Sequence, residues 1–109
     1  MASILVVLTS SPASPAGQRA LSVAESLANE GHRLNLICLQ DAVLLGSDRS
    51  PLEARSLLDR LLARGATLAV LGEDLACRGL RGSGRAAPVN HAGVVALLSA
   101  EHDRVIGAL

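Results

Sequence analysis

The chain has 109 residues, half of them apolar, which is enough for one domain with its own core over residues 1–109. Ten acidic residues balance ten basic ones, all of them arginine, and this balance excludes the general attraction to nucleic acid or acidic membranes that a strongly basic protein has. Because the chain contains no Trp, Tyr or Phe, nucleic-acid bases have no aromatic side chain to stack on, and direct nucleic-acid binding is not expected.

Targeting and metal-binding signals are missing from the sequence. The apolar run at residues 4–8 is far shorter than a membrane span and has no basic region before it, so we expect a cytoplasmic protein with no membrane segment. Cys38 and Cys77 lie in different kinds of segment without C-x-x-C spacing, and the histidines share no ligand spacing. We therefore expect free thiols, no metal and no cofactor.

Strands and helices are predicted to alternate along the chain. Short apolar runs that stop at polar residues indicate strands, and apolar residues at helical spacing indicate helices. In chain order, the pattern predicts a strand at 4–8, a helix at 14–31, a strand at 34–39, a short turn at 42–45, a helix at 50–65, a strand at 66–71, a helical turn at 73–77, a strand at 87–89, a helix at 91–100 and a strand at 104–106. This order predicts an α/β fold with a parallel sheet of four to five strands and helices on both faces, in flavodoxin-like layering.

Particular residues are expected at the ends of these elements. Ser14 and Pro15 suit the N-cap and the first position of the first helix. Asp41 is expected to cap the short turn that follows the second strand. Pro88 would confine its short strand to an edge of the sheet or to a strand start, because proline cannot donate to a ladder.

Any chemistry is expected where the strands end. Ligand sites of parallel sheets lie at the carboxyl ends of the strands, so residues 9–11, 39–41 and 71–73 should be neighbours. The first of these segments is rich in hydroxyl groups, but such residues are also the usual way for a strand to end, and we interpret it as a plain turn.

Cys77 is the one candidate nucleophile. Cys38 lies within an apolar strand, where cysteine behaves as a small hydrophobic residue. Cys77 stands beside Arg78, and a nearby cation favours the reactive thiolate, whereas Glu73 and Asp74 oppose it. An inert and a reactive Cys77 both remain open.

One segment carries a family resemblance. Residues 71–80, L-G-E-D-L-A-C-R-G-L, resemble the N-E-D-L-x-A-R-G-L signature of the DsrH/TusB branch of the DsrE/DsrF/DsrH (TusD/TusC/TusB) sulfur-relay family. Residues 39–43, L-Q-D-A-V, are similar to the L-Q-D-G-V that follows the family's second strand, and residues 5–10 look like its first strand. The last twenty or so residues match loosely, and the C-terminal aromatic residue of some TusB-type chains is missing.

The resemblance implies a DsrE-like fold and a persulfide relay, in which a cysteine carries sulfane sulfur toward tRNA wobble-uridine thiolation or dissimilatory sulfur oxidation. It also implies a hetero-oligomer with DsrE/TusD-like and DsrF/TusC-like subunits, or a homo-oligomer if the chain acts alone. In the family's catalytic subunit the sulfur-carrying cysteine ends the third strand. The match places Leu71 there, and Cys77 stands where the signature has alanine.

These departures predict a non-catalytic DsrH/TusB-like accessory subunit. Leucine cannot carry sulfur, and acids at the following helix start would repel a persulfide anion. The expected interface or site-lining residues are Gln40, Asp41, Leu71, Glu73, Asp74 and Arg78. Two alternatives stay open: a sulfurtransferase that carries persulfide on Cys77, and a small-molecule binding module that uses the strand ends.

Overall fold

The computed structural model describes residues 2–107 and contains a five-stranded sheet in which every pair of neighbouring strands is parallel. The strands are β1 (Ser3–Leu8), β2 (Arg33–Cys38), β3 (Thr67–Leu71), β4 (Ala87–Val89) and β5 (Arg104–Ile106). Their order across the sheet is β4-β3-β2-β1-β5. The predicted parallel α/β fold is confirmed, and Pro88 lies on an edge strand as expected.

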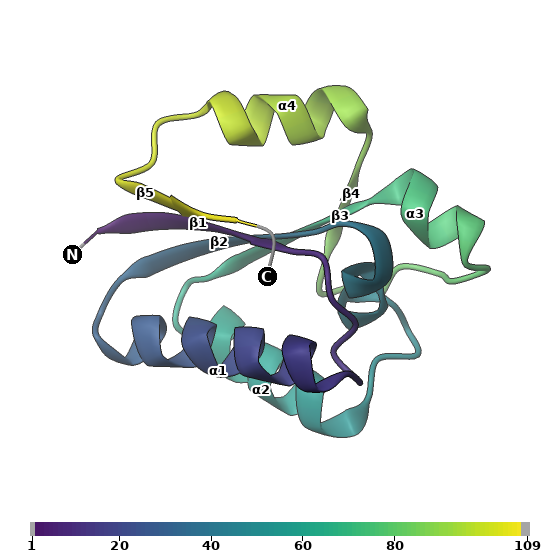
Figure 1. Cartoon of the computed structure of the whole chain (residues 1–109), viewed down its shortest axis with the longest axis horizontal. Coiled ribbons are helices and arrows are strands. Elements are labelled where there is room, and N and C mark those ends of the chain that lie inside the picture. Colours follow the sequence, from purple (N-terminus) through teal and green to yellow (C-terminus); the bar gives the residue numbers. More distant parts are fainter. Residues whose placement is uncertain (1, 108–109) are drawn as a thin grey trace.

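Helices cover both faces of the sheet (Figure 1). They are α1 (Pro15–Asn29), α2 (Leu52–Ala63), α3 (Gly72–Cys77) and α4 (His91–Ser99), with a 3₁₀ helix, η1 (Gln40–Gly46), after β2. Crossovers between parallel strands are right-handed, so the steps from β1 to β2 to β3 place α1 and α2 on the same face. The return from β4 to the far edge beside β1 runs in the other direction, and α4 therefore covers the opposite face.

The three central strands, β1, β2 and β3, are mostly buried on both sides, which explains their apolar sequence. Ile4, Val6 and Leu8 face the α1/α2 side, where the larger core lies. Leu5 and Val7 face α4, where the buried cluster is smaller. No helix in residues 2–107 is long and apolar enough to cross a membrane.

The start of α1 confirms the predicted cap. Ser14 is the N-cap, and its Oγ accepts a hydrogen bond from the Gly17 backbone N at 3.0 Å, with Pro15 as the first helical residue. A Cβ at position 17 would overlap the backbone carbonyl of Ser11, so this close approach of loop and helix requires glycine.

The segment between α3 and β4 is fixed to the rest of the molecule by several contacts, among them a hydrogen bond from the Asp48 backbone N to the Arg81 carbonyl at 2.9 Å. The backbone N of Ser83 donates to the carbonyl of Gly46 at 2.9 Å. Further on, Arg85 Nε donates to Asp59 Oδ1 on α2 at 2.5 Å. This contact lowers the pKa of the Asp59 carboxyl and raises the pKa of Arg85, because each charge is favoured by the other.

Candidate functional site

The three segments that were predicted to be neighbours, residues 9–11, 39–41 and 71–73, leave the sheet at the same edge. In the strand register Leu8 lies opposite Cys38, and Cys38 lies opposite Val70, so β1, β2 and β3 end at the same level. The backbone N of Leu39 donates to the carbonyl of Leu8 at 2.9 Å and extends this alignment past the last strand residue. The prediction that residues 9–11, 39–41 and 71–73 leave the sheet side by side is therefore confirmed.

The turn after β2 is capped by a residue of α3. Gln40 has a φ of 52°, an uncommon value for a residue with a side chain. Its backbone N donates to Asp74 Oδ2 at 2.6 Å, so the carboxylate satisfies a free donor at the start of η1. The expectation that Asp41 caps this turn is wrong, because Asp41 lies within the 3₁₀ helix and its side chain pairs with Arg78 instead.

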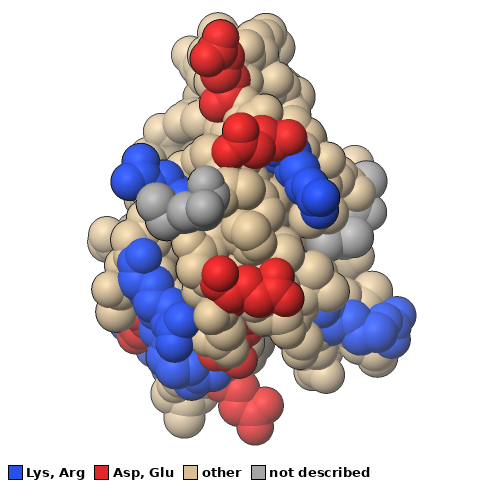
Figure 2. Space-filling view, turned by 90° about the vertical axis from the view of Figure 1, so that its left-hand side faces the viewer, with Lys and Arg blue, Asp and Glu red and all other residues tan. Residues whose placement is uncertain are grey.

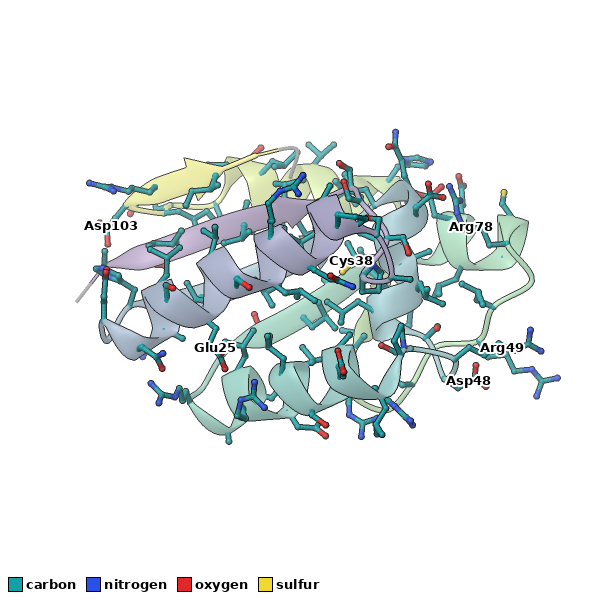
Figure 3. All side chains as sticks on the ribbon, turned by 60° about the horizontal axis from the view of Figure 1, so that its bottom comes forward. Glu25, Cys38, Asp48, Arg49, Arg78 and Asp103 are labelled. Carbon is teal, nitrogen blue, oxygen red and sulfur yellow. The ribbon has the colours of Figure 1, made fainter. Side chains whose placement is uncertain are left out.

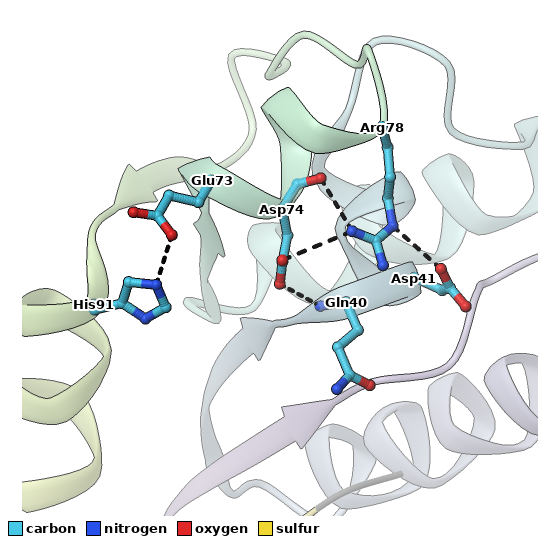
Figure 4. Close-up of polar contacts among 6 residues, drawn as sticks. All are labelled: Gln40, Asp41, Glu73, Asp74, Arg78 and His91. Atoms are coloured by element: carbon cyan, nitrogen blue, oxygen red, sulfur yellow. Dashed lines mark hydrogen bonds and ion pairs between the residues drawn. The ribbon is translucent and has the colours of Figure 1, made fainter.

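Arg78 joins the two segments (Figure 4). Its Nε donates to Asp41 Oδ1 at 3.1 Å, and its Nη1 donates to the Asp74 carbonyl at 3.3 Å. The same Nη1 lies 3.7 Å from Asp74 Oδ1. We call Gln40, Asp41, Asp74 and Arg78 the edge cluster. It ties η1 to α3 and holds the carboxyl edge of β2 and β3 in one arrangement.

A second polar contact joins α3 to α4. Glu73 Oε2 lies 2.6 Å from His91 Nε2, and both side chains are about two-thirds exposed to solvent (Figure 4). His91 begins α4, whose N-cap Asn90 accepts a hydrogen bond from the Gly93 backbone N at 2.8 Å. The sequence reasoning missed both contacts. An asparagine before an apolar run could have indicated the cap, but nothing local indicates the pairing of Glu73 with His91.

Leu71 lies at the end of β3, but its side chain is not exposed at the carboxyl edge of the sheet. It is the last strand residue and the N-cap of α3, and only 6% of its surface is exposed. Its side chain belongs to the apolar cluster under α4, whose other buried members are Leu5, Val7, Ile37 and Val94. This position is part of the core.

The two cysteines occupy opposite environments. Cys38 is fully buried in the layer between the sheet and the helices, and this burial raises the pKa of its thiol to about 12 (Figure 3). The prediction that Cys38 is a core residue is confirmed. Cys77 is exposed at the last residue of α3. The guanidinium of the neighbouring Arg78 pairs with Asp41 and Asp74, so it does not serve as the partner of the Cys77 thiol.

Two surface hollows lie away from the edge cluster and are lined by none of its residues. One, of about 440 Å³, lies between α1 and α2, and its apolar lining includes Pro12, Leu21 and Leu57. Another, of about 560 Å³, is lined by residues at the starts of β2 and β3, including Arg33 and Arg64. Figure 2 shows that acidic and basic side chains are interspersed on this end of the molecule. Within residues 2–107 no group of three or more His, Cys, Asp or Glu side chains could hold a metal ion.

Comparison with known proteins places this chain in a family. The model of the family described as "DsrH like protein" matches residues 13–105. No curated protein sequence matches the chain. The crystal structure of the ychN protein from E. coli has the same fold, with a TM-score of 0.79 at 22% sequence identity over 97% of this chain and 98% of the other. The matched span includes η1, the edge cluster and α4, and on this evidence the chain belongs to the DsrH-like family.

Proposed function

We propose that this chain is a non-catalytic subunit of a cytoplasmic persulfide relay complex, in which DsrE/TusD-like and DsrF/TusC-like subunits are its partners. The complex would serve tRNA wobble-uridine thiolation or sulfur oxidation. The observation that carries this proposal is the end of β3, where the catalytic subunit of the resembled family has its cysteine. Here that position holds the buried Leu71.

The electrostatics at this point support the proposal. Glu73 and Asp74 occupy the first turn of α3, where a catalytic cysteine would need groups that favour an anion. Asp74 already accepts the Gln40 backbone N and faces Arg78, so these two donors are used within the chain. A persulfide anion at this edge would meet the carboxylates of Glu73 and Asp74, and like charges at short range repel.

The same residues suit an interface. The edge cluster fixes the backbone of η1 and α3, while the carboxylates of Asp41 and Glu73 stay largely exposed at 71% and 67%. A rigid edge with projecting acidic groups can contribute specific, charge-dependent contacts to a partner subunit.

Co-expression with DsrE-like and DsrF-like chains tests the proposal. Wild type is expected to co-purify with both partners, and Glu73→Arg is expected to weaken the complex because it reverses a charge at the proposed interface. Glu53→Arg, which reverses an exposed charge on α2, is the matched control and should leave the complex intact. Failure of wild type to bind either partner would refute the proposal, as would equal effects of the two substitutions.

A sulfurtransferase role for Cys77 is the second candidate, and it is favoured by the exposure of this thiol. In such a role the Cys77 thiolate attacks the sulfane sulfur of a donor persulfide, a new S–S bond forms on Cys77, the donor's S–S bond breaks and the donor thiol leaves.

Intact-mass analysis after exposure to a persulfide donor separates the two candidates. A carrier gains about 32 Da, the mass of one sulfur atom, by thiol–disulfide exchange chemistry. That gain should vanish in Cys77→Ser and persist in Cys38→Ser. Under the accessory-subunit proposal, wild type gains nothing, and the increment appears on the partner chain.

A further inference from the structure

A hollow of about 560 Å³ opens at the amino edge of the sheet, where β2 and β3 begin, and we call it the amino-edge hollow. This edge is the end of the molecule that faces the viewer in Figure 2. The volume lies within the range of sites that hold small molecules. None of the described residues that line the hollow is acidic, and its polar and charged lining consists of His32, Arg33, Asn35, Arg64 and Thr67.

Two arginines bring positive charge to the amino-edge hollow. Arg33 forms no ion pair and no side-chain hydrogen bond with any residue in 2–107. Arg64 Nη1 donates to the Ala28 carbonyl at 3.2 Å, which holds the guanidinium beside the end of α1 without neutralising its charge. Arginines elsewhere, such as Arg85, pair with carboxylates. Both charges at the hollow therefore remain available to an anion.

A neutral donor lies beside these charges. Asn35 is opposite Thr67 in the strand register, and Thr67 Oγ1 donates to Asn35 Oδ1 at 2.8 Å. The amide carbonyl of Asn35 is thereby fixed, while its two N–H donors meet no acceptor among residues 2–107. Arg33 and Asn35 are two positions apart in β2, so their side chains project on the same side of the sheet.

His32 forms part of the wall, but its nitrogens are used within the chain. Its Nδ1 accepts a hydrogen bond from the Ala2 backbone N at 3.2 Å, and its Nε2 lies 3.5 Å from Glu30 Oε2. The donors left for a ligand are therefore those of Arg33, Arg64 and Asn35.

We propose that the amino-edge hollow binds a small molecule through a phosphate ester group, with Arg33, Arg64 and Asn35 as the donors. A phosphate monoester carries about two negative charges at pH 7, which two guanidinium groups match in charge and in geometry. One phosphate group fills only part of such a volume, and the remainder accommodates the rest of the molecule.

The charge of the lining distinguishes this hollow from the one between α1 and α2. Glu53 lines that other hollow, and no basic residue does so among the described residues, so an anionic ligand is not expected there. The amino-edge hollow also lies at the opposite edge of the sheet from the edge cluster. Its ligand is therefore independent of the persulfide relay proposed above, and each proposal can fail without the other.

Titration with ribose 5-phosphate, followed by amide chemical shifts in NMR spectra, tests the proposal. Wild type is expected to show saturable shifts at residues 31–35 and 64–67, and to bind ribose and inorganic phosphate more weakly. Arg33→Gln is expected to weaken binding about tenfold, because a charge-assisted hydrogen bond is lost. Arg19→Gln removes the same charge from an exposed position on α1 outside the hollow, and this matched control should bind like wild type. Circular dichroism establishes that each variant is folded.

Several results would overturn the proposal. Absence of binding by wild type would do so, and equal effects of the two substitutions would show only general attraction between charges. Equal affinity for inorganic phosphate would show that no ester is recognised. Displacement of ribose 5-phosphate by a short RNA that binds more tightly would assign the hollow to nucleic acid, and the small-molecule proposal would fail.

Discussion

Replacing Asp74 by alanine should loosen the junction between η1 and α3. The Asp74 carboxylate caps the start of η1 through a 2.6 Å bond from the Gln40 backbone N, and its side chain is only 23% exposed. Loss of a capping carboxylate costs about 1 kcal/mol, within a range of roughly 0.5–2. Loss of the partly exposed ion pair with Arg78 adds about 0.5 kcal/mol. We therefore expect the free energy of unfolding to fall by about 1.5 kcal/mol.

Urea denaturation, followed by circular dichroism, measures this loss. A change of this size should lower the melting temperature by about 8 °C in a chain this small. Asp74→Asn keeps an oxygen acceptor but loses the charge, so it should cost about half as much. Glu101→Ala, at an exposed acid that follows α4, is the control and should stay within about 0.5 kcal/mol of wild type.

A double-mutant cycle with Arg78→Ala tests the proposed coupling. Because Asp74 and Arg78 share contacts, the loss in the double variant should be smaller than the sum of the two single losses. Strict additivity would refute the edge cluster as a cooperative unit, and so would an Asp74→Ala variant as stable as the control.

Three further predictions follow from burial, charge and packing. A thiol reagent should modify native Cys77 but spare the buried Cys38 until the chain unfolds. Because burial raises the pKa of Cys38 to about 12, the free energy of unfolding should decrease as the pH rises from about 8.5 to that pKa. Cys38→Ala should remove this pH dependence. Because Arg85 lowers the pKa of Asp59, their contact should persist above the usual aspartate pKa and be lost as the pH falls through the lowered value. Protection of residues 81–86 from hydrogen exchange, measured relative to the intrinsic exchange rate at each pH, should then fall in acid, and it should fall at neutral pH in Asp59→Asn. Unchanged protection would contradict the role of this pair. Gly17→Ala should lower the free energy of unfolding by about 2 kcal/mol or more, because its Cβ would overlap a backbone carbonyl of the preceding loop; a wild-type urea midpoint would show that the loop moves freely.

Local sequence patterns were sufficient to predict where the helices and strands lie in the chain. The β-branched run at 4–8, the Ser14-Pro15 start of α1 and the short strand that contains Pro88 all have the predicted place, because each depends on residues adjacent in the chain. Asp41 shows where such reasoning fails. Its type and position suit a cap, but Arg78 from α3 takes its carboxylate, and Asp74 caps the turn instead.

By itself, the sequence determined the alternation of strands and helices, the parallel sheet and the burial of Cys38. Each of these follows from residue type and near-neighbour spacing. The tertiary structure alone decided that Gln40 meets Asp74 and Glu73 meets His91, contacts that join residues 34 and 18 positions apart. It also decided that α4 leaves Val95 and Leu98 in solvent. Strand order and register set these distances and exposures, and both arise from the packing of the whole sheet, which no local pattern encodes.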